Sequence, residues 1–194
     1  MIGKGKSISH GVAALEYDLA KEINGQAVAT EIARHELYGC TGAEMVQEMK
    51  PYHIDFPNVK NNCLRFEVSP SIEESATFTD ADWAELGNDF MQRMGLANHQ
   101  YIIIRHSGTE SKKEQAHLHI LANRVSLSGE LYRDNWIGKK ATEAANAIAK
   151  ERNFVQSQDI GKVNKAEIKE AMDGVLKKMQ GFDFTKFKEE LGKR

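Results

Sequence analysis

The feature that most constrains this chain is the stretch 101–124, which indicates a buried strand, a polar loop and a second strand. Residues 101–104 form an apolar run, and His106 ends it. Ser107, Gly108 and two nearby lysines are turn or solvent residues. After the loop the chain alternates, with Leu118, Ile120 and Ala122 on one face and His117, His119, Leu121 and Asn123 on the other. The pattern predicts a hairpin whose strands lie inside a sheet.

The alternation places two histidines together. Side chains on a strand repeat every second residue, so His117 and His119 point the same way. The hairpin would bring His106 alongside them. Imidazole is the commonest protein ligand for a divalent metal. A pair of satisfied polar side chains is the competing interpretation, but the joint arrangement favours a metal site because buried imidazoles need partners.

The overall charge sets a limit on the binding partner. The chain has 194 residues, with 26 Lys+Arg against 28 Asp+Glu, a net charge of −2. A nucleic-acid binder is usually more basic, so composition argues against that function. It does not exclude it, because a local basic groove can be balanced by acidic helices elsewhere.

The sequence shows no sign of a membrane or an oxidising compartment. No apolar run approaches the ~20 residues of a membrane span, and the N-terminus lacks the apolar segment of a signal peptide. The two cysteines, Cys40 and Cys63, follow no metal or disulfide spacing. We therefore expect a cytoplasmic protein with no membrane partner.

The N-terminal segment contains a tyrosine in an unusual place. A helix is expected from Ser9 to Glu22. Tyr17 lies opposite its apolar stripe, which we assign to Ile8, Val12, Leu15, Leu19 and Ile23. A core aromatic belongs on the stripe, so Tyr17 either packs under another element or is functional. The glycines at 3 and 5 would let a backbone pass close to a ligand.

The remaining pattern predicts an α+β fold. We expect strands at 26–37 and 63–69, and helices at 41–50, 79–94 and 136–152. Thr41 and Glu44 form a capping box at the start of the first of these helices. The prediction is a central antiparallel sheet with the histidine strands adjacent and helices packed mainly on one face. After residue 155 the composition shifts to Lys, Glu and Gln. We expect one domain over 1–155 and a helical C-terminal extension over 156–194, which either ends a short protein or begins a longer part.

These motifs resemble a known family. His117-x-His119, followed by apolar residues and Asn123-Arg124 and preceded by His106, is similar to the HUH motif of relaxases. Relaxases are mobilisation nucleases that nick plasmid and transposon DNA for conjugation. The opening residues up to Tyr17 resemble a Bacteroidetes-type relaxase, and the resemblance covers roughly 1–150. It implies a palm-like nuclease domain acting on single-stranded DNA at an origin of transfer (oriT), with accessory mobilisation and coupling proteins as partners.

The resemblance also implies roles for individual residues. His106, His117 and His119 would hold the metal. Tyr17 would attack the phosphodiester and leave a 5′-phosphotyrosine. The metal ion would activate the phenol, or Glu67 or Glu110 would take its proton, with Glu16 and Asp18 as weaker candidates because adjacent helix positions do not face each other. Many relatives have an aspartate where this chain has Thr109-Glu110. The expected DNA contacts are Lys4, Lys6, His10, Lys21 and Arg124.

The sequence leaves alternatives open for the metal ion and for the class of protein. Imidazole chemistry alone favours Zn²⁺, whereas the resemblance implies Mg²⁺ or Mn²⁺, with Zn²⁺ or Ni²⁺ as ions that a crystal could contain. A rolling-circle replication initiator uses the same motif, but its tyrosine lies on a helix after the histidines, where this chain has only Tyr132. A catalytically silent DNA-binding module and a metal-stabilised domain without a DNA role also fit. Salt-dependent binding of single-stranded DNA, with and without EDTA, separates these.

Overall fold

The computed structural model describes residues 1–108 and 115–193, except for the side chains at 160 and 163. Glu110 therefore lies outside the described residues. Contacts divide the chain into two compact units, Met1–Phe154 and Val155–Arg194.

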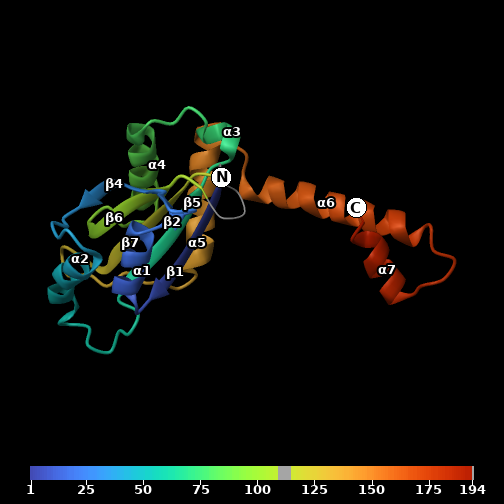
Figure 1. Cartoon of the computed structure of the whole chain (residues 1–194). Helices are drawn as coiled ribbons and strands as arrows, with labels where there is room; N and C mark the ends of the chain where they lie inside the picture. Colours follow the sequence, from blue (N-terminus) through green and yellow to red (C-terminus); the bar gives the residue numbers. More distant parts are fainter. Residues whose placement is uncertain (109–114, 194) are drawn as a thin grey trace. The chain divides into compact units, whose positions relative to one another are not determined.

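The first unit is built on a five-stranded antiparallel sheet (Figure 1). Its order is β1 (Ile2–Ile8), β5 (Cys63–Ser69), β7 (His117–Ser126), β6 (His99–His106) and β4 (Ala29–His35). The central strand is β7, and β6 pairs with it. The predicted α+β fold, with an antiparallel sheet and adjacent histidine strands at its centre, is confirmed.

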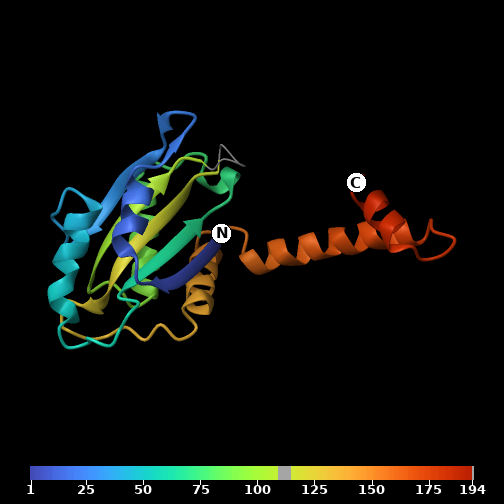
Figure 2. The same cartoon turned by 60° about the horizontal axis from the view of Figure 1, so that its bottom comes forward.

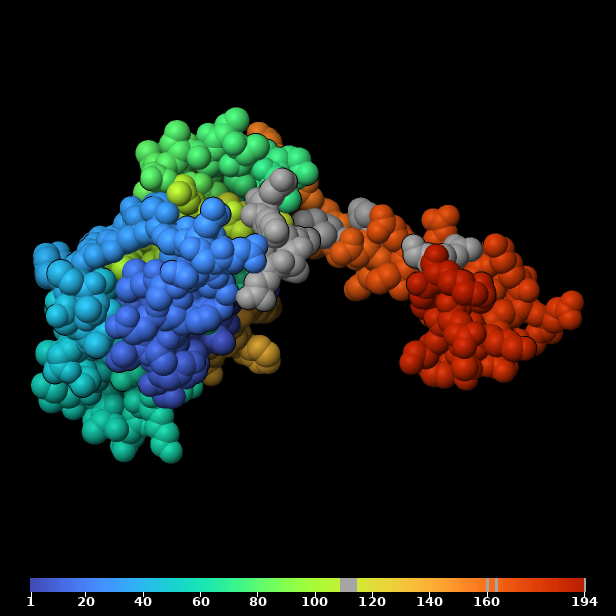
Figure 3. Space-filling model, viewed as in Figure 1, coloured from blue at the N-terminus to red at the C-terminus, as the bar shows by residue number. Residues whose placement is uncertain are grey.

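Two short helices pack on one face of this sheet. They are α1 (Gly11–Leu19) and α2 (Gly42–Met49), and Figure 2 shows α1 lying across the strands. In Figure 3 the blue surface of these helices forms the near face of the unit. The α2 helix begins at the predicted capping box of Thr41 and Glu44, and the 3₁₀ helix η1 (Lys50–His53) follows it. Their core joins Leu15 and Met45 to the strands.

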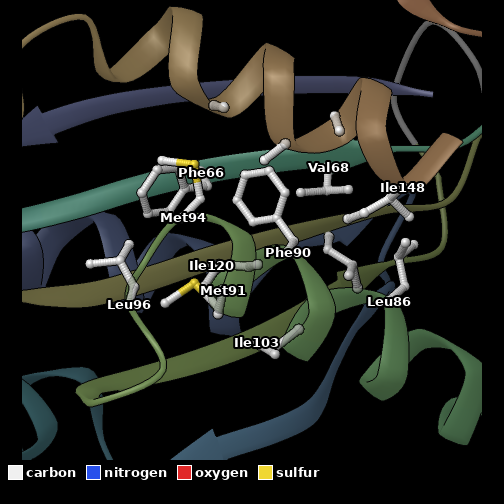
Figure 4. Close-up of a cluster of buried hydrophobic side chains, with 14 of the residues drawn as sticks. Phe66, Val68, Leu86, Phe90, Met91, Met94, Leu96, Ile103, Ile120 and Ile148 are labelled. Atoms are coloured by element: carbon white, nitrogen blue, oxygen red, sulfur yellow. The ribbon is translucent and has the colours of Figure 1, made fainter. Parts of the chain in front are cut away.

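Two longer helices cover the opposite face. They are α4 (Asp80–Arg93) and α5 (Ile137–Glu151), and the short α3 (Ile72–Ser75) precedes α4. Figure 4 shows Phe66 of β5 and Ile120 of β7 in one apolar cluster with Phe90 of α4. The alternation predicted for β7 places its even-numbered residues here. The longer helices thus share one face as predicted, and the other face also carries two helices.

The α1 helix differs from its prediction in length and in buried face. It ends at Leu19 and is followed by the small hairpin of β2 (Glu22–Ile23) and β3 (Gln26–Ala27). Val12, assigned to the apolar stripe, is exposed, while Asp18 is buried. Asp18 can take a position inside the protein because Arg65 pairs with its carboxylate.

Two glycines of β1 allow neighbouring elements to pack closely against this strand. A Cβ at Gly3 would lie 2.4 Å from the backbone oxygen of Ala141 on α5, and one at Gly5 would lie 2.8 Å from the Phe66 ring. Absence of a Cβ therefore lets α5 approach the edge strand closely. The predicted close approach exists and α5 makes it, while the approach of a ligand to these glycines stays a prediction.

The second unit consists of α6 (Ser157–Leu176) and α7 (Phe184–Leu191). Asp183 caps α7 by accepting a hydrogen bond from the backbone of Lys186. Val175 and Phe187 are its buried apolar residues among those described. None of the helices in the described parts of the chain has the length and hydropathy needed to cross a bilayer.

Candidate active site

Three histidines meet on the face of the sheet that carries α1. His106 ends β6 and pairs in register with His117 of β7, and His119 lies two residues further along β7. One ring nitrogen from each histidine lies within 4.8 Å of the others. The ring centroids of His106 and His119 are 4.5 Å apart, and those of His117 and His119 are 4.9 Å apart. The sheet register thus brings the three imidazoles to one point.

The spacing of these nitrogens fits a divalent ion. His117 Nδ1 donates a hydrogen bond to the backbone oxygen of Gln115 at 3.1 Å, so its Nε2 keeps the lone pair. That Nε2 lies 3.1 Å from Nε2 of His119. Two ring nitrogens this close need a proton or a cation between them. Two metal–nitrogen bonds of about 2.1 Å at about 95° span the same distance.

His106 is fixed by the end of α1. Its Nε2 donates to the backbone oxygen of Asp18 at 2.7 Å, which leaves the lone pair on Nδ1. This carbonyl lies in the last turn of α1, where helix carbonyls lack an N–H partner within the helix. His106 therefore closes the C-terminal end of α1. His106 makes this bond with its Nε2, whereas His117 and His119 direct their Nε2 atoms at each other.

The carboxylate of Asp18 reaches a second histidine. Its side chain is 2% exposed and accepts hydrogen bonds from Nε and Nη2 of Arg65. Its Oδ1 lies 3.9 Å from Nδ1 of His119, and Nη2 of Arg65 lies 3.4 Å from the same nitrogen. Burial raises the pKa of Asp18, and the Arg65 guanidinium opposes that rise. Asp18 thus connects α1 to two of the three histidines.

From the sequence, Asp18 ranks below Glu67 and Glu110 as a site residue, because adjacent positions on a helix do not face each other and Tyr17 and Asp18 therefore seem unable to serve one site. A signal was nevertheless present. Gly11, Ala14, Leu15 and Asp18 follow the spacing of three and four residues that marks a buried helix face. A carboxylate on such a face needs a buried cation, and Arg65 provides it.

Two of the three histidines are held in their neutral form. Burial, together with the nearby charges of other residues, lowers the pKa of His119 to about 2. Burial also lowers the pKa of His106. Neutral imidazole is the form that ligates a metal ion, so the site is prepared for one at neutral pH.

Tyr17 lies on the same helix as Asp18 and is accessible. Its side chain is 56% exposed, and its hydroxyl oxygen accepts a hydrogen bond from Nζ of Lys21 at 2.7 Å. Two other tyrosines are less available. Tyr101 is buried, with its hydroxyl bonded to Asn88, and Tyr132 is partly buried with Lys140 over its ring. Burial raises the pKa of both phenols.

A pocket beside the histidines contains several of the other expected residues. It has a volume of about 200 Å³. Glu67 lies directly opposite His119 in the sheet and pairs with Lys4 at 2.8 Å. His10, by contrast, precedes α1 on the exposed surface and does not line this pocket. The lining residues are Lys4, Gly5, Lys6, Arg65, Phe66, Glu67 and His119.

Arg124 lies away from the histidines. Arg124 is an even-numbered residue of β7, and the even-numbered side chains of this strand face α4 and α5. It also lies five residues beyond His119. Its guanidinium bonds to Asp134 at 2.6 Å and to the backbone oxygens of Asn61 at 2.9 Å and Tyr132 at 3.2 Å. The structure therefore shows Arg124 holding loops together, and the expected phosphate contact stays a prediction.

The sequence-family comparison assigns the chain to a family. Residues 17–154 match the family model described as "Relaxase: MobA/VirD2-like, nuclease domain". The match begins at the candidate tyrosine and spans the three histidines. The chain belongs to this family of relaxases.

Other comparisons add little beyond this. Among solved structures, the chain is similar to the conjugative relaxase TrwC in complex with oriT DNA, in its metal-bound form. The two share 11% sequence identity, with 98% of this chain and 90% of that chain covered, and the TM-score is 0.47. No curated protein matches the chain.

Proposed function

We propose that this chain nicks one strand of DNA at an origin of transfer by transesterification at Tyr17. The observation that carries the proposal is the position of Asp18. It follows Tyr17 in the chain and contacts His106 and His119, so the helix that carries the accessible phenol is attached to the histidine centre. Membership of a relaxase nuclease family supports DNA as the substrate class.

The proposed reaction exchanges one phosphate ester for another. The Tyr17 oxygen bonds to the phosphorus as the bond from phosphorus to the 3′ oxygen breaks. The products are a 5′-phosphotyrosine and a strand with a free 3′-OH. The phenol loses one proton and the leaving oxygen gains one. Because one phosphate ester replaces another, the reaction can run backwards and rejoin the strand.

Residues around the phenol would assist proton loss. The Lys21 ammonium lies at the oxygen that becomes negative. We assign Glu67 as the proton acceptor, because it lies on the histidine face and its side chain is 34% exposed. The carboxylate of Asp18 is enclosed by Arg65 and is unsuited to that role. Glu110, the other carboxylate expected there, lies outside the described residues.

His106, His117 and His119 would hold the divalent ion. When bound, the ion supplies Lewis-acid polarisation of the nonbridging phosphate oxygens. We propose Mg²⁺ or Mn²⁺ as the working ion, although the imidazole set also suits Zn²⁺ or Ni²⁺. Lys4, Lys6 and Arg65, which line the adjoining pocket, would bind neighbouring phosphates of the strand. In this proposal the protein acts in the cytoplasm with accessory mobilisation and coupling proteins.

The covalent product provides the test. Wild-type protein incubated with labelled single-stranded oriT DNA should give a protein–DNA adduct on a denaturing gel, and EDTA should prevent it. Tyr17→Phe should give no cleavage and no adduct, because the nucleophilic oxygen is gone. Its unfolding free energy should change by no more than about 0.5 kcal/mol, since the hydroxyl is exposed.

Tyr38→Phe is the matched control. Tyr38 is 76% exposed, lies between β4 and α2, and bonds to Glu36 rather than to a residue of the site. This variant should cleave DNA as wild type does. An adduct formed by Tyr17→Phe would disprove the assignment. Cleavage without any adduct in wild type would indicate hydrolysis by water instead.

A further inference from the structure

An exposed tryptophan lies outside the candidate active site, at the start of α5. Trp136 is 80% exposed and has a left-handed backbone, with φ 59° and ψ 27°. For a bulky residue this conformation is strained, and exposure of the indole gains no burial energy. Packing and backbone preference therefore both disfavour a tryptophan here. Such an outlier motivates a search for a functional role.

Two lysines and a glutamate line a shallow depression together with this indole. Trp136, Lys139, Lys140 and Glu143 line a depression of about 290 Å³. Nζ of Lys140 is held by the backbone oxygen of Arg133 at 2.8 Å and lies 5.0 Å from the Tyr132 ring centroid. Lys139 is exposed, with Glu143 3.8 Å away. The patch therefore combines one aromatic face with positive charge; we call Trp136, Lys139 and Lys140 the tryptophan patch.

The tryptophan patch lies across one strand from the histidine pocket. At the start of α5, a Cβ on Gly138 would lie 3.5 Å from the backbone oxygen of Gly5. Gly5 lies between Lys4 and Lys6, which line the pocket beside His119. Because β1 is an edge strand, no further strand lies between these two surfaces. In Figure 3 the gold surface of residues near 140 emerges beside the dark blue N-terminal strand.

We propose that the tryptophan patch binds an unpaired nucleotide of the DNA strand that occupies the histidine pocket. The strand would leave the pocket over Lys4 and Lys6, cross the edge at β1 and stack one base on Trp136, with Lys139 and Lys140 next to its phosphates. This inference rests on the proposed function. Single-stranded DNA sites combine aromatic stacking with a positive groove, whereas lysine is depleted in protein–protein interfaces.

The chain provides its own optical probe. It has two tryptophans, and the other, Trp83, lies on the buried face of α4 and is 2% exposed. Oligo(dT) should therefore quench the emission of Trp136 and protect it from acrylamide, while Trp83 contributes a constant background. The measurement uses the full chain with Tyr17→Phe, so that binding is not followed by cleavage. Oligo(dT) is lengthened one nucleotide at a time, and quenching should begin only at a length greater than the shortest that binds.

Variants separate the patch from the catalytic site. Trp136→Ala should weaken oligo(dT) binding, measured by fluorescence anisotropy of labelled DNA, by about 5- to 150-fold, the range expected for one stacked base. Trp136→Phe should bind nearly as wild type but lose the quenching signal. Tyr38→Ala, which removes another exposed aromatic side chain, should leave both affinity and quenching unchanged.

The outcomes distinguish this inference from the proposed function. Unchanged affinity in Trp136→Ala, with adduct formation at Tyr17 intact in the parent protein, would overturn the inference alone. Quenching that persists in Trp136→Phe would assign the signal to Trp83 and would also overturn it. If the emission of Trp136 changed with protein concentration and not with added DNA, the patch would instead be a contact between protein molecules. Absence of both DNA binding and the adduct would refute the proposed function, and this inference with it.

Discussion

At the scale of single residues, Asp18 is the position with the most consequences. Asp18→Asn would leave Arg65 without its anionic partner, which costs about 2–4 kcal/mol of unfolding free energy, measured by urea denaturation, since Arg65 is one-fifth exposed. The change also removes a carboxylate beside Nδ1 of His119. We therefore expect Mn²⁺ affinity, measured by calorimetry, to fall at least about 10-fold.

Glu22→Gln is the control for this substitution. It removes one exposed carboxylate just beyond the same helix and should alter neither quantity. If Asp18→Asn lowered stability but left Mn²⁺ affinity unchanged, the carboxylate would support the fold without acting on His119.

The histidines predict a loss of stability in acid. In the folded, metal-free protein the pKa of His119 is lowered to about 2 and that of His106 is also lowered, mainly by burial. The unfolded chain therefore takes up protons first, as pH falls below about 6.5. Unfolding free energy in EDTA should decrease by up to about 1.4 kcal/mol per pH unit for each such histidine.

Urea denaturation between about pH 7 and pH 5 measures this slope, in the range where the unfolded histidines titrate. His119→Gln should reduce it, because one of the contributing groups is gone. A slope that is the same in wild type and His119→Gln would show that this imidazole is not held neutral by the fold.

At the scale of elements, the contact between β1 and α5 depends on a missing side chain. Gly3→Ala would place a Cβ 2.4 Å from the Ala141 backbone oxygen and 2.6 Å from the Ala145 side chain. Neither neighbour can rotate away, so the helix must move. We expect a loss of about 1–3 kcal/mol in unfolding free energy, measured by thermal or urea denaturation.

Gly138→Ala tests the same interface with room for the added atom. Its Cβ would lie 3.5 Å from the nearest atom, an ordinary contact. Alanine is also the better helix former by about 1 kcal/mol. This variant should therefore be as stable as wild type or more so, and equal destabilisation by both changes would contradict the packing explanation.

Elements with strong periodicity were predictable from sequence. The strand Cys63–Ser69 and the capping box at Thr41 occur where the pattern indicates them, because alternation and cap chemistry are local. The α1 helix was predicted too long, and its predicted buried stripe left out Asp18. Its ion pair with Arg65 joins positions far apart in the chain, and no local pattern contains that information. The convergence of the histidines followed from strand geometry, whereas their hydrogen-bond partners did not.

At the scale of the whole molecule, the two units predict independent folding. The core of the first unit is complete within Met1–Phe154 and includes Phe154 itself, which packs near Phe78. A chain ended after Phe154 should keep its unfolding free energy within about 0.5 kcal/mol, as for changes remote from a core. Its metal affinity should also be unchanged. Calorimetry and urea denaturation check this, and a truncated chain that fails to fold would show that residues 155–194 stabilise the first unit.

The hydrogen bond between His106 and Asp18 has a consequence for how this site can be mapped. The acceptor is a main-chain oxygen, and every amino acid supplies that atom. Alanine scanning, deep mutational libraries and comparisons among relatives would all register the carboxylate of residue 18 and overlook its carbonyl. The attachment of the tyrosine helix to the histidine can therefore persist while the side chain at this position drifts. Only an edit of the backbone itself, such as an ester in place of the amide that follows residue 18, would expose it.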